Sequence, residues 1–313
     1  MIFNELFEEY LLNRRILGLK ESTISTYTKF YEAQLKDYFG NVDLQNFNDT
    51  LISTFILKIF DKKLSRKYIK NIVGLLYSIL DYAKIKYREY PELLYIEKRR
   101  IKTDREEIKI FTEVEQNRLE EYIISNKTPV NIGFLLMFYT GIRIGELCAL
   151  KIKDIDLDEQ CLYIKYTMQR VKNISSNSKK KTKIIIDRPK SSSSIRKIPL
   201  SDFLIPILRN SFKGVENSAF FLTNSDKFIE PRSMENNFKK LLKKLEIDYK
   251  SPHKARHTFA TTMLYLGVDE KSLSEWLGHS STAITLNEYV HPTFSKKVEQ
   301  ANLLNQKFLD KHK

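Results

Sequence analysis

Two arginines of the chain, Arg143 and Arg256, have the chemistry to hold a phosphate ester. Arg143 lies in the segment TGIRIGELCAL and Arg256 in HKARHTFAT. A guanidinium can bind two phosphate oxygens and stabilise the charge that develops when phosphorus is attacked. Gly141 should end one helix just before Arg143, and Glu146 lies one helical turn beyond it. Arg143 alone is explained at least as well as a surface arginine, and Glu146 equally well as a brace or as a solvated residue.

Four further residues could transfer protons or attack phosphorus: Lys190, His253, His279 and Tyr289. Lys190, in PKSSSSIRKIPL, precedes a serine-rich turn, where a lysine could donate a proton if its pKa were lowered. For a single lysine, a solvated turn is the ordinary explanation. Arg196 and Lys197 share this predicted hairpin and are rivals for the same role.

The histidines and the tyrosine are informative mainly through their spacing. His253 and Arg256 are three residues apart, so a helix would place them on one face, whereas His257 would point elsewhere. Metal binding is the rival explanation, but one histidine beside an arginine lacks a third ligand. His279 follows a helix stop, and Tyr289 lies ten residues later. A single tyrosine near a helix is most often a core residue.

Taken together and in this order, the six positions resemble the tyrosine recombinase, or phage integrase, family. The family pattern is Arg, Lys, His-x-x-Arg, His or Trp, and Tyr. The flanking segments TGIRIGEL, HKARHTFAT and LGHSS also match, over about residues 112–292. The resemblance implies site-specific DNA recombination, in which Tyr289 attacks a phosphodiester and leaves a 3′-phosphotyrosine and a 5′-hydroxyl. Because the covalent bond conserves the energy of the broken ester, neither metal nor ATP is expected as a cofactor.

The resemblance also assigns a role to each of the other residues. Arg143 and Arg256 would clamp the two non-bridging oxygens of the phosphate. Lys190 would protonate the leaving 5′-oxygen. His253 would help to deprotonate or orient the tyrosine, and His279 would hydrogen-bond the phosphate.

Three other functions compete with recombination. A type IB topoisomerase shares the chemistry but relaxes DNA without exchanging strands, and the LGHSS motif favours a recombinase. A DNA-binding regulator without catalytic activity is a further alternative. It is disfavoured because all six positions of the family pattern are intact. A metal nuclease is disfavoured because the motif regions contain no clustered carboxylates.

The charge distribution indicates a long polyanionic partner. The 313 residues carry a formal net charge of +14, of which +5 lies in residues 1–105 and +9 in the rest. We therefore expect both halves to clamp duplex DNA. The family resemblance adds self-association into a tetramer on paired sites, and it allows an accessory excisionase or DNA-bending protein. The predicted C-terminal helix carries an apolar stripe made of Val298, Ala301, Leu304 and Phe308. This stripe would dock on a neighbouring protomer or on its own domain.

The elements that must position these residues are predicted to be mainly helical, with a small antiparallel β-sheet. Nine Gly and eight Pro are few for this length, which argues against a turn-rich all-β fold. We expect a helical core-binding domain over 1–96, a charged linker over 97–111 and an α+β catalytic domain with a C-terminal helix over 112–313.

Local patterns give the expected boundaries of the elements. In the first domain, helices are expected near residues 3–17, 22–38, 50–60 and 65–87. Ser22 or Thr23 would cap the second of these helices. In the catalytic domain, a capping box over residues 112–115 opens a helix and residues 130–140 form a buried helix. Three strands are expected over residues 161–168, 184–187 and 195–200, and the chain is predicted to be helical again from Pro252.

Composition also restricts the location and the cofactors. Cys148 and Cys161 have neither metal-ligand spacing nor a disulfide framework, which indicates a reducing compartment. The N-terminus opens with acidic residues and shows no signal peptide. The most apolar run, residues 132–139, is shorter than the roughly 20 residues that span a bilayer. We expect a soluble cytoplasmic protein.

Overall fold

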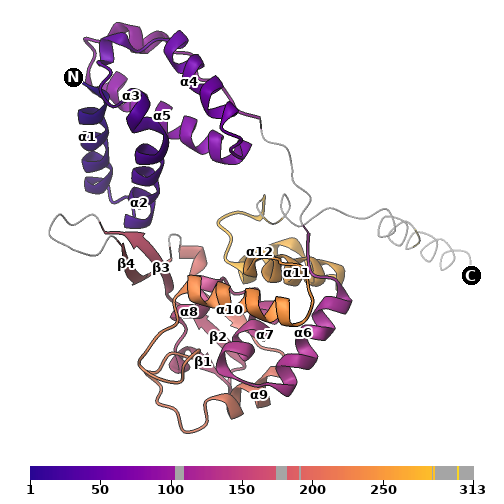
Figure 1. Cartoon of the computed structure of the whole chain (residues 1–313). Coiled ribbons are helices and arrows are strands. Elements are labelled where there is room, and N and C mark those ends of the chain that lie inside the picture. Colours follow the sequence, from indigo (N-terminus) through magenta and orange to yellow (C-terminus); the bar gives the residue numbers. More distant parts are fainter. Residues whose placement is uncertain (103–108, 174–181, 190–191, 284, 286–301, 303–313) are drawn as a thin grey trace, which may run out of the picture. The chain divides into compact units, whose positions relative to one another are not determined.

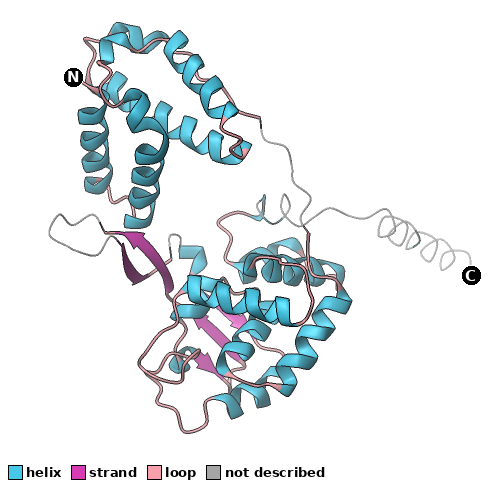
Figure 2. Cartoon of the chain, in the orientation of Figure 1, coloured by secondary structure: helices cyan, strands magenta, loops and turns pink. Residues whose placement is uncertain are grey.

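In a computed structural model, the described residues are 1–102, 109–173, 182–189, 192–283, 285 and 302. Helices dominate and the strands are short (Figure 1, Figure 2). The helices are α1 (Phe3–Ile16), α2 (Glu21–Phe30), α3 (Lys36–Phe39), α4 (Asp49–Asp61), α5 (Arg66–Lys86), α6 (Glu113–Ser125), α7 (Pro129–Thr140), α8 (Ile144–Ala149), α9 (Leu204–Ser211), α10 (Pro231–Lys244), α11 (Pro252–Tyr265) and α12 (Glu270–Leu277). The strands are β1 (Ile155–Asp156), β2 (Cys161–Ile164), β3 (Thr167–Lys172), β4 (Thr182–Asp187) and β5 (Arg196–Pro199). The predicted fold class is confirmed.

The chain divides into two compact units, each with its own hydrophobic core. One unit comprises residues 1–108 and 170–183, and the other comprises 109–169 and 184–313. The finer division at 1–96, 97–111 and 112–313 stays a prediction. No helix within the described ranges is long and apolar enough to cross a membrane.

The first unit is a helical bundle with an aromatic core. Ser65 caps its longest helix, α5, by accepting a hydrogen bond from the Tyr68 backbone N–H at 3.2 Å. The rings of Phe7 and Tyr31 stack with centroids 3.7 Å apart. These aromatic residues are part of the core, as their helical spacing predicts.

One predicted cap in this unit is wrong. Helix α2 begins at Glu21 with Lys20 as its N-cap, so Ser22 and Thr23 lie inside the first turn and cannot cap it. The chain turns into the helix from an extended Lys20, and Glu21 places a negative charge at the positive end of the helix dipole.

The second unit is built around α7. Residues 132–138 and Thr140 of this helix are buried, and it packs against α6, α8, α9 and α11. Thr128 caps it by accepting from the Asn131 N–H at 3.2 Å, and Gly141 ends it in the left-handed conformation (φ +63°). The predicted capping box is confirmed at α6, where the Thr112 side chain and the Glu115 side chain each accept the other residue's backbone N–H.

A three-stranded antiparallel sheet, ordered β1-β2-β5, completes this unit. The strand predicted over residues 161–168 is too long, because β2 ends at Ile164 and the chain enters β3 at Thr167. Strand β5 alternates in the ordinary way for a pleated strand: Arg196 and Ile198 point inward, and Lys197 is exposed. Two residues of one predicted hairpin therefore face opposite sides of the sheet.

Gly141 offers a test of this packing. An added Cβ would lie 2.6 Å from Cδ1 of Phe259 and 2.9 Å from Cδ2 of Leu277, both of which are buried. We expect Gly141→Ala to lower the free energy of unfolding by about 2–5 kcal/mol, from a left-handed backbone cost of ~1–2 and an overpacking cost of ~1–3. Urea unfolding measures the loss.

Gly214 is the matched control, since it also has a positive φ (+75°) but open space around its Cα. Gly214→Ala should therefore show only the backbone cost of about 1–2 kcal/mol. Equal losses for the two variants would contradict the packing around Gly141.

Candidate active site

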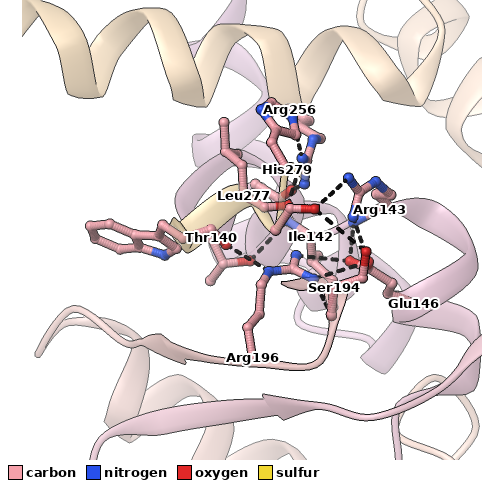
Figure 3. Close-up of polar contacts among 12 residues, drawn as sticks. Thr140, Ile142, Arg143, Glu146, Ser194, Arg196, Arg256, Leu277 and His279 are labelled. Carbon is pink, nitrogen blue, oxygen red and sulfur yellow. Dashed lines mark hydrogen bonds and ion pairs between the residues drawn. The ribbon is translucent and has the colours of Figure 1, made fainter. Parts of the chain in front are cut away.

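Arg143 lies at the N-cap of α8 and is tied to Glu146 (Figure 3). Its Nη1 donates to Glu146 Oε1 at 2.8 Å, and its backbone N–H donates to Oε2 at 3.0 Å. The Arg143 side chain is 34% exposed, whereas that of Glu146 is 2% exposed. The carboxylate is therefore a buried brace for Arg143, and its solvated alternative is wrong.

Glu146 remains ionised despite its burial. Burial alone would raise the pKa of Glu146, but hydrogen bonds and charge from Arg196, with the charge of Arg143, outweigh it and hold the pKa below its ordinary value. A buried carboxylate keeps its charge only where such partners surround it.

Arg256 projects from α11 and is 1% exposed. Its Nη1 donates to the carbonyl oxygen of Gly141 at 2.7 Å, and its Nη2 donates to that of Leu277 at 2.7 Å. The same Nη2 lies 2.9 Å from Nε2 of His279. The end of α7, the end of α12 and His279 thus meet at one guanidinium.

The C-terminal end of α12 collects three arginines. The carbonyl oxygens of residues 276, 277 and 278 accept hydrogen bonds from Arg196, Arg256 and Arg143, at 2.6, 2.7 and 3.3 Å respectively. The last carbonyls of a helix have no partner within the helix and carry partial negative charge. This helix end therefore provides the acceptors that hold the guanidinium groups in place.

His279 is neutral, and its tautomer follows from its partners. An arginine can only donate, so Nε2 of His279 accepts from Arg256, and Nδ1 then carries the proton that it donates to Thr285 Oγ1 at 2.8 Å. Burial, together with the positive charges of Arg256 and Arg143, lowers the pKa of His279 to about 3. In this arrangement Nε2 has no proton to give to a phosphate.

His253 lies on α11 one turn before Arg256, and its side chain is exposed. Its ring packs edge-on against that of His257, with centroids 4.7 Å apart. His257 is buried, and burial lowers its pKa to about 4. No role was predicted for His257, although its spacing of four from His253 is the signal for this contact.

The remaining predicted residues divide into two groups. Lys190 and Tyr289 lie outside the described residues, as does the predicted apolar stripe of residues 298–308. Lys197 and Arg196 are described, and neither is placed as a proton donor. Lys197 pairs with Glu159 at 2.5 Å, which raises the pKa of Lys197, and Arg196 is buried in the arginine cluster. Within the described ranges, no three His, Cys, Asp or Glu residues are grouped as metal ligands.

Comparison with known families identifies the class of protein. Residues 109–296 match the model described as "Phage integrase family", and residues 2–60 match "Phage integrase, N-terminal SAM-like domain". The first match alone covers more than half of the chain. The chain belongs to the phage integrase family.

Relatives along most of the chain are tyrosine recombinases. A XerC-like tyrosine recombinase from Caldanaerobacter subterraneus subsp. tengcongensis is 29% identical, and the match covers 91% of this chain and 78% of the relative. Tyrosine recombinase XerA of Pyrococcus furiosus is 27% identical, with coverage of 96% and 95%. The chain is thus a DNA strand-transferring enzyme of site-specific recombination, and the topoisomerase and regulator alternatives are not favoured.

Solved structures share the fold. The Tn1549 transposon integrase in complex with a circular intermediate DNA has a TM-score of 0.78 at 22% identity, covering 96% of this chain and 99% of that one. A lambda integrase tetramer bound to a Holliday junction has a TM-score of 0.66 at 16% identity, with coverage of 92% and 77%. Both similarities concern the fold alone.

The low pKa of His279 is measurable. Because the folded state favours the neutral ring, its stabilising contribution is present above the unfolded pKa near ~6.5 and is lost as the pH falls toward about 3. Imidazole ¹⁵N spectra should show the Nδ1-protonated tautomer from pH 8 to about 4. The resonance that disappears in His279→Asn gives the assignment, and the chain in urea should titrate near ~6.5. A folded-state midpoint near 6.5 would contradict the geometry.

Proposed function

We propose that this recombinase cuts one DNA strand by attack of Tyr289 on phosphorus, while Arg143 and Arg256 bind the non-bridging oxygens. The observation that supports it most strongly is the convergence of Arg143, Arg256 and His279 on the end of α12. These are three of the six positions that the family pattern requires. Arg143 lies more than 100 residues before Arg256 and His279 in the sequence, so no local structural need would bring them together.

The charge of the cluster matches the transition state. Among the described residues of this cluster, three guanidinium groups face the single carboxylate of Glu146 and His279 is neutral, so the cluster itself carries a net positive charge. A phosphodiester carries one negative charge, and the pentacoordinate transition state carries close to two. The site therefore stabilises the transition state more than the ground state, which is the requirement for catalysis.

Arg143 has capacity left for a phosphate. Of its five N–H donors, described residues accept two: Nη1 donates to Glu146, and Nη2 donates to Gly278 O. Its partial exposure lets DNA reach the guanidinium. A bound phosphate would also bring negative charge to His279 and favour its protonated form, in which both nitrogens donate.

Lys190 remains the best candidate for the general acid. Its two predicted rivals are engaged elsewhere: Lys197 lies on the outer face of β5 and pairs with Glu159, and Arg196 is buried against Glu146. His253, exposed one helical turn before Arg256, would help to deprotonate or orient the tyrosine.

Partners follow from the same proposal. The integrase structures named above contain DNA, and the lambda enzyme is a tetramer on a Holliday junction. We propose that this chain binds duplex DNA with both units, forms a tetramer on paired sites, and acts in the cytoplasm, with an accessory excisionase or DNA-bending protein as a further partner. The net charge of +14 supports the first of these.

Tyr289→Phe should bind DNA but form no covalent adduct, because phenylalanine has no oxygen to attack phosphorus. A nicked suicide substrate, followed by a denaturing gel, detects the adduct with the unaltered chain. An adduct that persists in the Phe variant would reject Tyr289 as the nucleophile.

Lys190→Ala should cleave ordinary DNA about 10²–10⁴-fold more slowly, because an alkoxide leaves phosphorus poorly without a proton donor. If sulfur replaces the 5′-bridging oxygen, the leaving group is a thiolate whose conjugate acid has a pKa near ~8.5, and it needs no donor. The cleavage rate of each variant is measured on ordinary DNA and on the sulfur substrate. Lys190→Ala should approach the wild-type rate on the sulfur substrate.

Two variants complete this experiment. Tyr289→Phe should fail on both substrates. Lys197→Ala should show no selective rescue by sulfur. Equal slowing of Lys190→Ala on both substrates, or rescue of Lys197→Ala instead, would remove Lys190 from the role.

A further inference from the structure

Arg196 is bound through every nitrogen of its guanidinium. Its Nε donates to Trp276 O at 2.6 Å, its Nη1 donates to Glu146 Oε1 at 3.0 Å and to Ser194 O at 3.1 Å, and its Nη2 donates to Glu146 Oε2 at 2.9 Å. The side chain is 5% exposed. A planar guanidinium that is held by hydrogen bonds at Nε, Nη1 and Nη2 has a single orientation, and all of these bonds are to protein acceptors.

These contacts join three segments that are distant in the sequence (Figure 3). Arg196 begins β5, Glu146 belongs to α8 and Trp276 to α12. The two hydrogen bonds to Glu146 form a bidentate pair, the strongest geometry between an arginine and a carboxylate.

The shared Glu146 carboxylate determines how much of the positive charge of Arg143 is available to a phosphate. Oε1 of Glu146 accepts from both Arg143 Nη1 and Arg196 Nη1, whereas the Arg143 backbone and Arg196 Nη2 share Oε2. Without Arg196, the buried carboxylate would have Arg143 as its only cationic partner among these residues. The Arg143 guanidinium would then turn further toward Glu146 and lose donors that the phosphate requires.

The end of α12 leads to the same conclusion. Arg196 binds the first of three successive carbonyls, and the next two bind Arg256 and Arg143. The packing is close, since a Cβ on Gly278 would lie 2.9 Å from Cδ of Arg196. Arg196 therefore fixes the helix end from which both phosphate-binding arginines are positioned.

We propose that Arg196 is a positioning residue that neutralises Glu146 and anchors the end of α12, so that Arg143 presents its charge to the scissile phosphate. Arg196 itself does not touch DNA. This role rests on the proposed function of Arg143. It predicts that Arg196 affects the rate of DNA cleavage only through the contact between Arg143 and one phosphate oxygen.

A substrate with altered phosphate charge tests this route. Replacing one non-bridging oxygen of the scissile phosphate by methyl removes its charge, so the arginine that serves that oxygen becomes dispensable. Arg196→Lys should keep a charge beside Glu146 but lose the fork, and should cleave ordinary DNA about 10–100-fold more slowly, as is typical when a residue that orients a site group is lost. On the methylphosphonate stereoisomer that rescues Arg143→Ala, its defect should largely disappear.

The double variant gives an independent readout. If Arg196 acts through Arg143, then Arg143→Ala with Arg196→Lys should be no slower than Arg143→Ala alone. Arg209→Lys is the matched control, because Arg209 lies on α9 with a 61% exposed side chain and should leave the rate unchanged. Circular dichroism and thermal melting monitor folding. If Arg196→Lys does not fold, Arg196→Gln replaces it, because it keeps Glu146 but loses the guanidinium charge, and it should show the same substrate dependence.

The outcomes separate the two proposals. Wild-type cleavage by Arg196→Lys, an equal defect on both substrates, or a defect that adds to that of Arg143→Ala would each overturn the positioning role. A wild-type chain without covalent adduct, or Arg143→Ala with full activity on ordinary DNA, would instead overturn the proposed function.

Discussion

Buried guanidinium groups are stable only where each finds acceptors, and this requirement organises the catalytic unit. Arg256 is 1% exposed and the Arg196 side chain 5%. An unpaired charge at such depth would cost several kcal/mol. The acceptors are the last carbonyls of α12, the carbonyl of Gly141 and the carboxylate of Glu146. Each of these groups would itself be costly to bury without a donor.

The surrounding fold supplies these acceptors at chain reversals. Gly141 ends α7 and Gly278 ends α12, both in the left-handed conformation. Helix ends expose carbonyls that no residue of the same helix can satisfy. The packing of α11 against α7 and α12 then brings Arg256 within reach of both ends. The two glycines thus supply turns whose carbonyls hold the site.

The same cluster sets the protonation state of its neighbours. Burial, together with the positive charge of the arginines, keeps His279 neutral, and the arginines keep Glu146 ionised, so the free site has one defined pattern of donors and acceptors. Such a pattern is preorganised: little reorientation is needed when a phosphate binds. Because the interaction of charges is stronger away from water, burial increases the effect of each guanidinium on an approaching anion.

The sequence by itself determined the local features and the chemistry. The capping box at Thr112 and the helix stop at Gly141 depend on neighbouring residues only, so their patterns were readable. The family pattern identified the class of enzyme. The cap of α2 was misjudged because Lys20, a poor cap by type, adopts the extended backbone that starts the helix.

Only the tertiary structure decided how the charges are shared. Arg196 and Lys197 are adjacent in the sequence and equally basic, and nothing local shows that one is buried against Glu146 and the other is exposed. That difference arises because the pleat of β5 turns alternate residues to opposite faces, and only one face meets α8 and α12. Interactions between segments 50 and 80 residues apart leave no periodic trace in the sequence.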